Sequence, residues 1–221
     1  MNLVFMGNPA FAVPALEKLA ASDYQIVAVV SNPPQKMGRG KKMRETAIAI
    51  KAKSMGLDVI QEQDLNSGHF IRELEELDAD LFVVVAFRIL PTSLISIPEL
   101  GSINLHGSLL PAYRGAAPIQ WALINGDEET GLSTFFITPK VDTGAVICQD
   151  RLSIRPSDNY GTLSERMGIL GSDLLVETIN LIESGTASAI KQNDNQASLA
   201  PKITKDMIII DWSRPAKELH N

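Results

Sequence analysis

The sequence predicts an α/β fold, with an open, mostly parallel, twisted sheet and helices on both of its faces. Short runs rich in Val, Ile and Leu alternate along the chain with stretches whose apolar residues recur at helical spacing. The run 80–87 contains Leu-Phe-Val-Val-Val-Ala, which is apolar on both faces, as expected of a central strand covered on both sides. Because strands and helices alternate over 221 residues, right-handed crossovers within one large domain are expected.

The expected strands are short and apolar, and an edge strand is expected near the end of the chain at 208–212. The others cover 3–6, 25–31, 59–60, 80–87, 102–106, 133–137 and 145–154. The segment 32–44 contains Pro-Pro and Gly-Arg-Gly, which predict a flexible loop.

Helices are expected where the apolar spacing changes to three and four residues. They cover 14–21, 46–55, 70–77, 118–126 and 162–185. Pro118 suits the first position of its helix and Gly126 its end. The last helix is predicted to open with a Thr-Leu-Ser-Glu capping box at Thr162 and to end at Gly185. Its apolar stripe consists of Leu163, Met167, Leu170 and Leu174.

Composition restricts the class of protein. Hydrophobic residues make up 45% and charged residues 21%, and no apolar run approaches the roughly 20 residues of a membrane span. A single cysteine, Cys148, excludes an internal disulfide and fits a reducing cytoplasm, so we expect a cytoplasmic protein. We also expect a monomer without a membrane partner. The net charge of −6 argues against a chain that coats nucleic acid. Five cations nevertheless lie within nine residues, so RNA contact is expected there first: Lys36, Arg39, Lys41, Lys42 and Arg44.

Candidate catalytic residues follow two of the predicted strands, where open α/β sheets bind their ligands. Asn104 and His106 are two residues apart at a strand end, so their side chains point to the same face. An amide and an imidazole can together donate hydrogen bonds to an oxyanion, as acyl transfer requires. Asp142 lies in a turn between two apolar strands and could orient the histidine, although an Asp-Thr-Gly turn alone is more often structural.

The sequence lacks the motifs of dinucleotide-cofactor, nucleotide-phosphate and metal sites. Gly7-Asn8-Pro9 follows the first strand with a single glycine, so the pyrophosphate cradle of nicotinamide and flavin enzymes is missing. There is also no Walker loop. His69 and His220 have no neighbouring metal ligands in the sequence, and we therefore expect no metal.

These residues together resemble the formyltransferases that use 10-formyltetrahydrofolate. The shared pattern, Asn-x-His-x-Ser-Leu-Leu-Pro and a later Asp-x-Gly, stands here at 104–111 and 142–144. Within this group the chain is most similar to the methionyl-tRNA formyltransferases, and the resemblance runs from residue 1 to the end. Its further hallmarks are Phe-Met-Gly-Asn-Pro at 5–9, Gly-Arg-Gly-Lys-Lys at 38–42, Tyr-Arg-Gly-Ala-Ala-Pro-Ile-Gln at 113–120, Ala-Pro-Lys-Ile at 200–203 and Ile-Asp-Trp-Ser at 210–213.

The resemblance implies a function and a set of site residues. It implies transfer of a formyl group from 10-formyltetrahydrofolate to the amino group of methionyl initiator tRNA, supporting translation initiation, with a Rossmann-like formyltransferase fold. Asn104, His106 and Asp142 match the catalytic trio, which stabilises an oxyanion and moves a proton without a covalent enzyme intermediate. The matching folate-binding residues are Ser108, Leu109, Leu110, Pro111, Ala86, Phe87, Arg88, Ile89 and Leu90. The residues that match the loop entering the tRNA acceptor end are Arg39, Lys41 and Lys42.

The chain departs from the family pattern at three places. Asn8 and Ala10 replace a Thr and an Asp, and the segment 86–91 is one residue shorter than in many members, which alters the expected floor of the pocket. Full-length members also carry a basic C-terminal β-barrel. We therefore expect a catalytic domain at 1–205 and the start of a linker at 206–221, with weakened tRNA binding.

Alternative functions remain open from the sequence. A formyltransferase acting on an amino sugar nucleotide shares the catalytic run, but it would have no polyanionic partner for the basic loop. A glycinamide ribonucleotide formyltransferase is disfavoured by the Arg-Gly-Ala-Ala-Pro run at 114–118, and a formyltetrahydrofolate hydrolase is a further candidate. A folate- or RNA-binding module without turnover is disfavoured by the intact trio.

Overall fold

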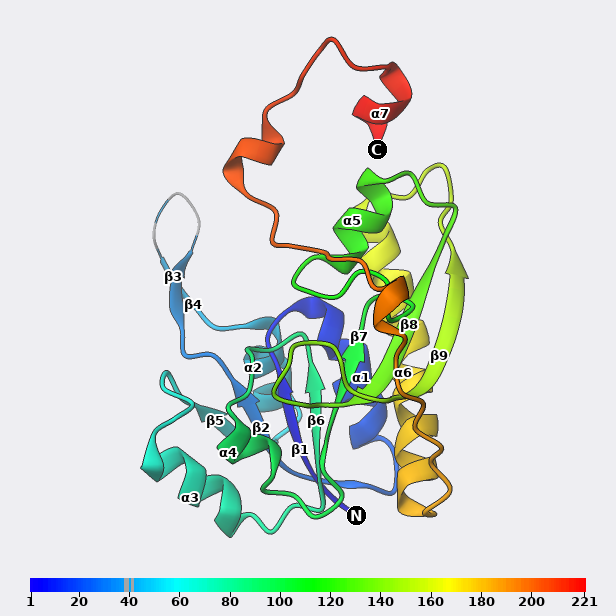
Figure 1. Cartoon of the computed structure of the whole chain (residues 1–221). Coiled ribbons are helices and arrows are strands. Elements are labelled where there is room, and N and C mark those ends of the chain that lie inside the picture. The colour runs from blue at the N-terminus through cyan, green and yellow to red at the C-terminus, as the bar shows by residue number, and fades with distance from the viewer. Residues whose placement is uncertain (38–39, 41) are drawn as a thin grey trace.

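The structure is a computed structural model that describes residues 1–37, 40 and 42–221 (Figure 1). Within this part of the chain, one sheet has the strand order β5-β2-β1-β6-β7-β8-β9. The strands from β5 to β7 are parallel, whereas β8 and β9 join antiparallel at one side. The strand bounds are β1 Asn2–Gly7, β2 Gln25–Ser31, β5 Val59–Gln61, β6 Leu81–Val85, β7 Ser102–His106, β8 Glu129–Phe136 and β9 Val146–Ser153. The predicted fold class, an open and mostly parallel sheet, is confirmed.

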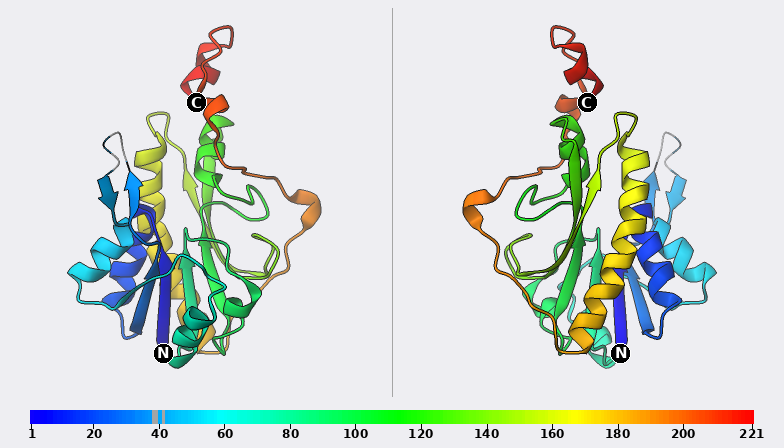
Figure 2. Two further views of the ribbon diagram at one scale, coloured as in Figure 1. Left: turned by 90° about the vertical axis from the view of Figure 1, so that its left-hand side faces the viewer. Right: turned by 90° about the vertical axis from the view of Figure 1, so that its right-hand side faces the viewer.

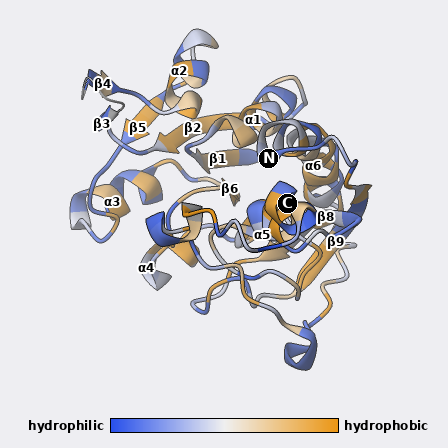
Figure 3. Cartoon of the chain, turned by 90° about the horizontal axis from the view of Figure 1, so that it is seen from above, coloured by the Kyte–Doolittle hydropathy of each residue, from blue (hydrophilic) through white to orange (hydrophobic). Residues whose placement is uncertain are grey.

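Helices cover both faces of the sheet, so alternate residues of the central strands enter two different hydrophobic clusters (Figure 2). On one face the strands pack against α1 (Val13–Ala20), α2 (Ala47–Ser54) and α6 (Tyr160–Glu183). On the other face they pack against α3 (Gly68–Glu76) and α4 (Thr92–Ile95). Every residue of β6 is buried, as its uninterrupted apolar sequence predicts. Viewed from above, β2 and β5 are hydrophobic. The outlying strands β3 (Gln35–Met37) and β4 (Lys42–Arg44) are largely hydrophilic (Figure 3).

The longest helix begins at a different residue from the one predicted. Asn159, not Thr162, is the N-cap of α6, and its side chain accepts hydrogen bonds from the backbone N–H groups of Gly161 and Thr162. Thr162 occupies the third helical position and reaches back to the N–H of Asn159, which completes a capping box three residues earlier than predicted. The helix ends before Gly185, which adopts a φ of 68° as a C-terminal glycine commonly does.

Two other predictions were wrong. The predicted loop at 32–44 contains a short antiparallel pair, β3 (Gln35–Met37) with β4 (Lys42–Arg44). The predicted edge strand at 208–212 does not form. Instead, a short 3₁₀ turn covers Lys205–Ile208, and every described side chain from residue 204 to residue 221 is exposed. A strand there would have no neighbour against which to bury its apolar side chains.

The remaining elements are short. The helix α5 covers Pro118–Ile124 with Pro118 in its first turn, as predicted, and α7 covers Ala216–His220. Further 3₁₀ turns cover Ala10–Ala12 and Asp194–Gln196. Among the described helices, none combines the length and the apolar character that a bilayer crossing requires.

Candidate active site

A cavity of about 520 Å³ opens beyond the carboxyl ends of β1, β6 and β7. Its wall is formed by the segments that follow these strands, by the start of α5 and by the turn between β8 and β9. This is the position at which open α/β sheets bind ligands, because loops leave the sheet in different directions there. The volume lies within the roughly 300–1,000 Å³ range of small-molecule sites.

Asn104 and His106 both line this cavity, as their alternation along β7 predicts. They pair with Phe135 and Ser133 of the antiparallel neighbour β8, which fixes the register of the strand end. The His106 side chain is only 6% exposed, whereas Asn104 is half-buried. Among the described residues, none forms a hydrogen bond with the Asn104 side chain, so its amide is available to a molecule in the cavity.

Both ring nitrogens of His106 face hydrogen-bond acceptors. Nε2 lies 2.9 Å from the backbone oxygen of Tyr113, and Nδ1 lies 3.8 Å from Oδ2 of Asp142. Nε2 is within hydrogen-bond distance of the carbonyl, whereas Nδ1 and the carboxylate are near neighbours without a direct hydrogen bond. The edge-to-face contact with Phe135, at 6.5 Å between ring centroids, holds the plane of the imidazole. The arrangement therefore fixes the imidazole at the edge of the cavity.

Asp142 is held in an unusual backbone conformation. Its φ of 52° lies in the left-handed region, which Asp adopts more readily than most residues. The carboxylate, 11% exposed, accepts a hydrogen bond of 2.8 Å from the backbone N–H of Gly115. Two residues later, a Cβ on Gly144 would lie 1.6 Å from the backbone oxygen of Phe136, so no other residue fits there. The close backbone approach therefore requires the glycine of the Asp-x-Gly motif, while the aspartate supplies the carboxylate.

The five predicted folate-binding residues that follow β6 line the cavity. Arg88 shapes this wall, because its guanidinium donates to the backbone oxygens of Gln63 and Glu62 at 2.7 and 2.5 Å and lies over the ring of Phe87. Burial lowers the pKa of Arg88, although the acidic side chain of Glu62 opposes the effect. Besides Arg88 and Phe87, the five residues comprise Ala86, Ile89 and Leu90.

The other four predicted folate-binding residues, Ser108, Leu109, Leu110 and Pro111, do not line the cavity. Ser108 is fully buried, and its hydroxyl donates to the backbone oxygen of Ala112 at 2.6 Å. The backbone N–H of Leu110 in turn donates to the hydroxyl of Ser133. These residues build the turn that brings the Tyr113 carbonyl against His106. The sequence motif is therefore explained here by turn geometry and not by a place in the cavity wall.

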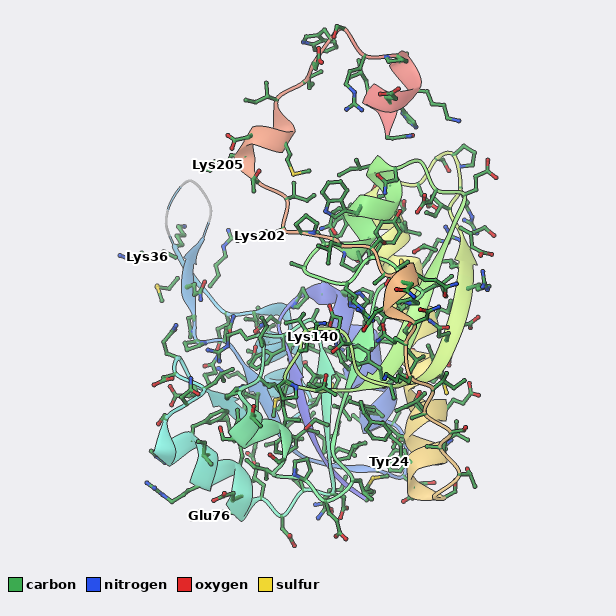
Figure 4. The ribbon with its side chains drawn as sticks, in the orientation of Figure 1. Tyr24, Lys36, Glu76, Lys140, Lys202 and Lys205 are labelled. Atoms are coloured by element: carbon green, nitrogen blue, oxygen red, sulfur yellow. The ribbon has the colours of Figure 1, made fainter. Side chains whose placement is uncertain are left out.

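The basic segment is described only in part. Arg39 and Lys41 lie outside the described residues, whereas Lys42 lies exposed on β4. Figure 4 shows Lys36 on the neighbouring strand β3, Lys202 and Lys205 on the C-terminal segment, and Lys140 below them in this view. All four labelled lysines are exposed.

Several cavity residues were not predicted. They follow β1, open α5, lie before Asp142 or start α6: Pro9, Phe11, Ile119, Gln120, Thr138 and Tyr160. The position after a strand could have indicated Pro9. Tyr160 was missed because the start of α6 was placed two residues too late. Within the described residues, no three His, Cys, Asp or Glu side chains come together as a metal site would require.

A polar amide, an imidazole and a carboxylate converge here on one cavity, which suits transfer of a small acyl group. The chain belongs to the formyl transferase family, whose model matches residues 1–179. Curated relatives named methionyl-tRNA formyltransferase match all of this chain and 70% of their own length. One from Porphyromonas gingivalis is 45% identical and one from Flavobacterium johnsoniae is 40% identical.

Solved structures show the same fold. An N-formyltransferase from Helicobacter canadensis, in complex with folinic acid and dTDP-3-aminofucose, matches with a TM-score of 0.71 at 24% identity, over 99% of this chain and 77% of its own. A phosphoribosylglycinamide formyltransferase from Anaplasma phagocytophilum matches with a TM-score of 0.71 at 21% identity, over 92% of this chain and 99% of its own. At these identities the likeness concerns the fold alone.

Proposed function

We propose that the protein transfers a formyl group from 10-formyltetrahydrofolate to the amino group of methionyl initiator tRNA. The observation that carries the proposal is the convergence of Asn104, His106 and Asp142 on one cavity. Relatives named methionyl-tRNA formyltransferase are 40–45% identical to this protein over the whole chain, which supports the choice of acceptor.

The cavity fits the formyl donor in size and character. Aromatic and aliphatic side chains from the segment after β6 form one wall, where a flat heterocycle would be held against apolar groups. We expect Ala86, Phe87, Arg88, Ile89 and Leu90 to hold the folate ring. The turn at 108–111 would act indirectly by placing the Tyr113 carbonyl and the end of β7. The donor supplies a formyl group on nitrogen for attack by an amine.

The catalytic trio would act by electrostatics and positioning. As the amine attacks, negative charge develops on the formyl oxygen, and the Asn104 amide would donate a hydrogen bond to it. Because Nε2 of His106 already faces the Tyr113 carbonyl and Nδ1 lies 3.8 Å from Asp142, the ring would border that oxygen and shape the oxyanion site beside Asn104. Asp142 would hold the ring and, through water, receive the proton that the amine loses. When the tetrahedral intermediate collapses, the bond between the formyl carbon and the folate nitrogen would break, and the proton would pass to that nitrogen as tetrahydrofolate leaves. The indirect role of the imidazole differs from the sequence-based expectation that it donates directly.

The hairpin β3–β4 is the proposed contact for the tRNA acceptor end. Replacing Arg39, Lys41 and Lys42 by Ala should raise the KM for tRNA and reduce its salt dependence, because fewer phosphate contacts release fewer counterions. The KM for folate should stay unchanged. Arg72→Ala, which removes an exposed cation from α3, is the matched control. Equal losses for both substrates would contradict a tRNA role for the hairpin.

We also propose that residues 1–205 form the catalytic domain and that 206–221 begin a linker. The burial pattern supports this boundary, because Ala200 is the last buried hydrophobic residue and the described side chains after 203 are exposed. Limited proteolysis should cut after residue 203 and leave a fragment with wild-type folate affinity. Early cleavage within 1–200 would contradict the boundary.

The direct test is formylation. The protein is incubated with 10-formyltetrahydrofolate and either charged initiator tRNA or an amino sugar nucleotide, and both products are quantified. Formyl-methionyl-tRNA alone is the expected product. Formylation of the sugar alone would retain the mechanism and overturn the acceptor, and folate binding without either product would indicate a binding module.

A further inference from the structure

A segment beyond the residues matched by the family model closes over the Asp142 side of the site. We call residues 190–200 the strap. At its start, Ile190 forms an antiparallel bridge with Val146 at the beginning of β9. Near its end, Leu199 forms a parallel bridge with Arg114, and the backbone N–H of Arg114 donates to Ser198. The strap therefore joins the start of β9, which follows the Asp142 turn in the sequence, to the segment 114–115, whose Gly115 contacts the Asp142 carboxylate.

Gln192 is a buried residue of the strap. Both the nitrogen and the oxygen of its side-chain amide form hydrogen bonds. Its side chain is 8% exposed. Its Nε2 donates to the backbone oxygens of Asp142 and Gly144 at 3.0 and 2.8 Å. Its Oε1 accepts from Nε and Nη2 of Arg114 at 3.0 and 2.7 Å. Because a guanidinium only donates and carbonyls only accept, the orientation of this amide is determined by its partners.

Arg114 links this contact to the carboxylate of Asp142. Its guanidinium is buried, and Nη1 forms an ion pair of 2.8 Å with Asp194, also on the strap. The next residue, Gly115, donates its backbone N–H to Oδ2 of Asp142. A Cβ on Gly115 would lie 2.6 Å from the backbone oxygen of Ala200, so strap and glycine are in direct contact. The backbone and the carboxylate of Asp142 are thus held by two adjoining parts of one network.

We propose that Gln192 is a positioning residue that sets the place of the Asp142 carboxylate relative to His106. The inference rests on the proposed function of the trio. A left-handed Asp is costly unless its surroundings hold it, and Gln192 supplies hydrogen bonds to both carbonyls of that turn. Without them, two partly enclosed carbonyls lose their partner, and the turn can relax to an ordinary φ that swings the carboxylate away from Nδ1.

Two substitutions separate positioning from packing. Gln192→Ala removes both ends of the contact. Gln192→Glu keeps the size and the bonds to Arg114, but it has no N–H to offer to the Asp142 and Gly144 carbonyls. We expect both to lower kcat about 10- to 100-fold, the loss typical of a misplaced catalytic group, with less than about a threefold change in the KM for folate. Gln61→Ala is the control, because it removes a Gln side chain that donates to the backbone oxygen of Asn32 near the far edge of the sheet.

The coupling to Asp142 provides the decisive comparison. In an Asp142→Asn background, Gln192→Ala should cost less than about twofold in addition, since its effect passes through the carboxylate that is already lost. Full additivity of the two losses, or wild-type kcat in Gln192→Glu, would overturn the inference.

A second readout does not depend on turnover. The chain has three histidines, so the ¹⁵N signals of the His106 ring can be assigned with a His106→Ala reference. They should shift in both Gln192 variants and remain unchanged in Gln61→Ala. If the wild-type protein formylates no tRNA, the proposed function fails, while these signals still test the positioning. Unchanged ring signals in folded Gln192 variants would refute it.

Discussion

Replacing His106 by Ala should cripple turnover while leaving the protein folded. In the proposed mechanism the ring lies beside the developing oxyanion, and loss of such a group costs roughly 10²–10³-fold in kcat, or about 2.7–4 kcal/mol. The structural cost is smaller. One hydrogen bond to Tyr113 contributes about 1 kcal/mol, and the edge contact with Phe135 about 0.5–1.5 kcal/mol. The ring borders an open cavity, so its removal leaves no sealed void.

The sum, about 2 kcal/mol, is well below the roughly 5–15 kcal/mol that stabilises a domain. For a chain of this size it corresponds to a fall in Tm of roughly 4–8 °C. Single-turnover formyl transfer and a thermal melt measure the two quantities separately. His69→Ala, on the exposed surface of α3, is the control and should change neither. Turnover within threefold of wild type in a folded His106→Ala protein would refute the assigned role.

Three further substitutions test the structure. Gly144→Ala should prevent folding or lower Tm by more than 10 °C, roughly the effect of 3–4 kcal/mol, because its Cβ would collide with the backbone oxygen of Phe136; a near wild-type melt would contradict the close approach. Tyr113→Phe removes two side-chain hydrogen bonds and should cost about 1–2 kcal/mol in urea unfolding, with a smaller loss of kcat through the loosened carbonyl at His106. Burial raises the pKa of Asp158, but its hydrogen bonds and the charge of Arg166 outweigh this and hold the pKa below 3.8. A lowered carboxyl pKa stabilises the folded state above the unfolded pKa, and this contribution is lost as the pH falls. The difference in unfolding free energy between wild type and Asp158→Asn should therefore be constant above about pH 5 and shrink below it. A constant difference down to about pH 2 would contradict the shift.

The sheet was predictable because each strand carries its own signal. The strand 102–106 was placed to the residue, and β6 was recognised from apolar character on both faces. Errors arose where local patterns compete with tertiary context. Ile-Ile-Ile-Asp-Trp at 208–212 has the composition of a strand, but within the described part of the chain no strand pairs with it. The capping box was misplaced because Asn159 caps as well as Thr does, and a Ser/Thr pattern overlooks it.

The common location of Asn104 and His106 was predictable from geometry, whereas Asp142 was linked to them through the family resemblance. Carboxyl ends of parallel strands share one edge, and ligands bind there in open α/β sheets. The segment after β6 was identified from the resemblance, and it lines the same cavity. Folate contact by Ser108–Pro111 stays a prediction, because a motif does not reveal whether its members contact a ligand or only shape the turn.

Gln192 shows the limit of reasoning from position along the chain. It lies 50 residues from Asp142, on a segment with only isolated bridges and one short 3₁₀ turn, and its neighbours in sequence give no indication of a site. Its proposed role follows from its hydrogen bonds to the Asp142 turn and to Arg114. Asp142 is constrained at its carboxylate by Gly115, at its carbonyl by Gln192, and through the close approach that Gly144 permits. Each constraint is weak alone, since a hydrogen bond contributes about 1 kcal/mol. Together they hold one left-handed residue in place, so losses at these positions should be strongly non-additive, as expected of groups that act on a single residue.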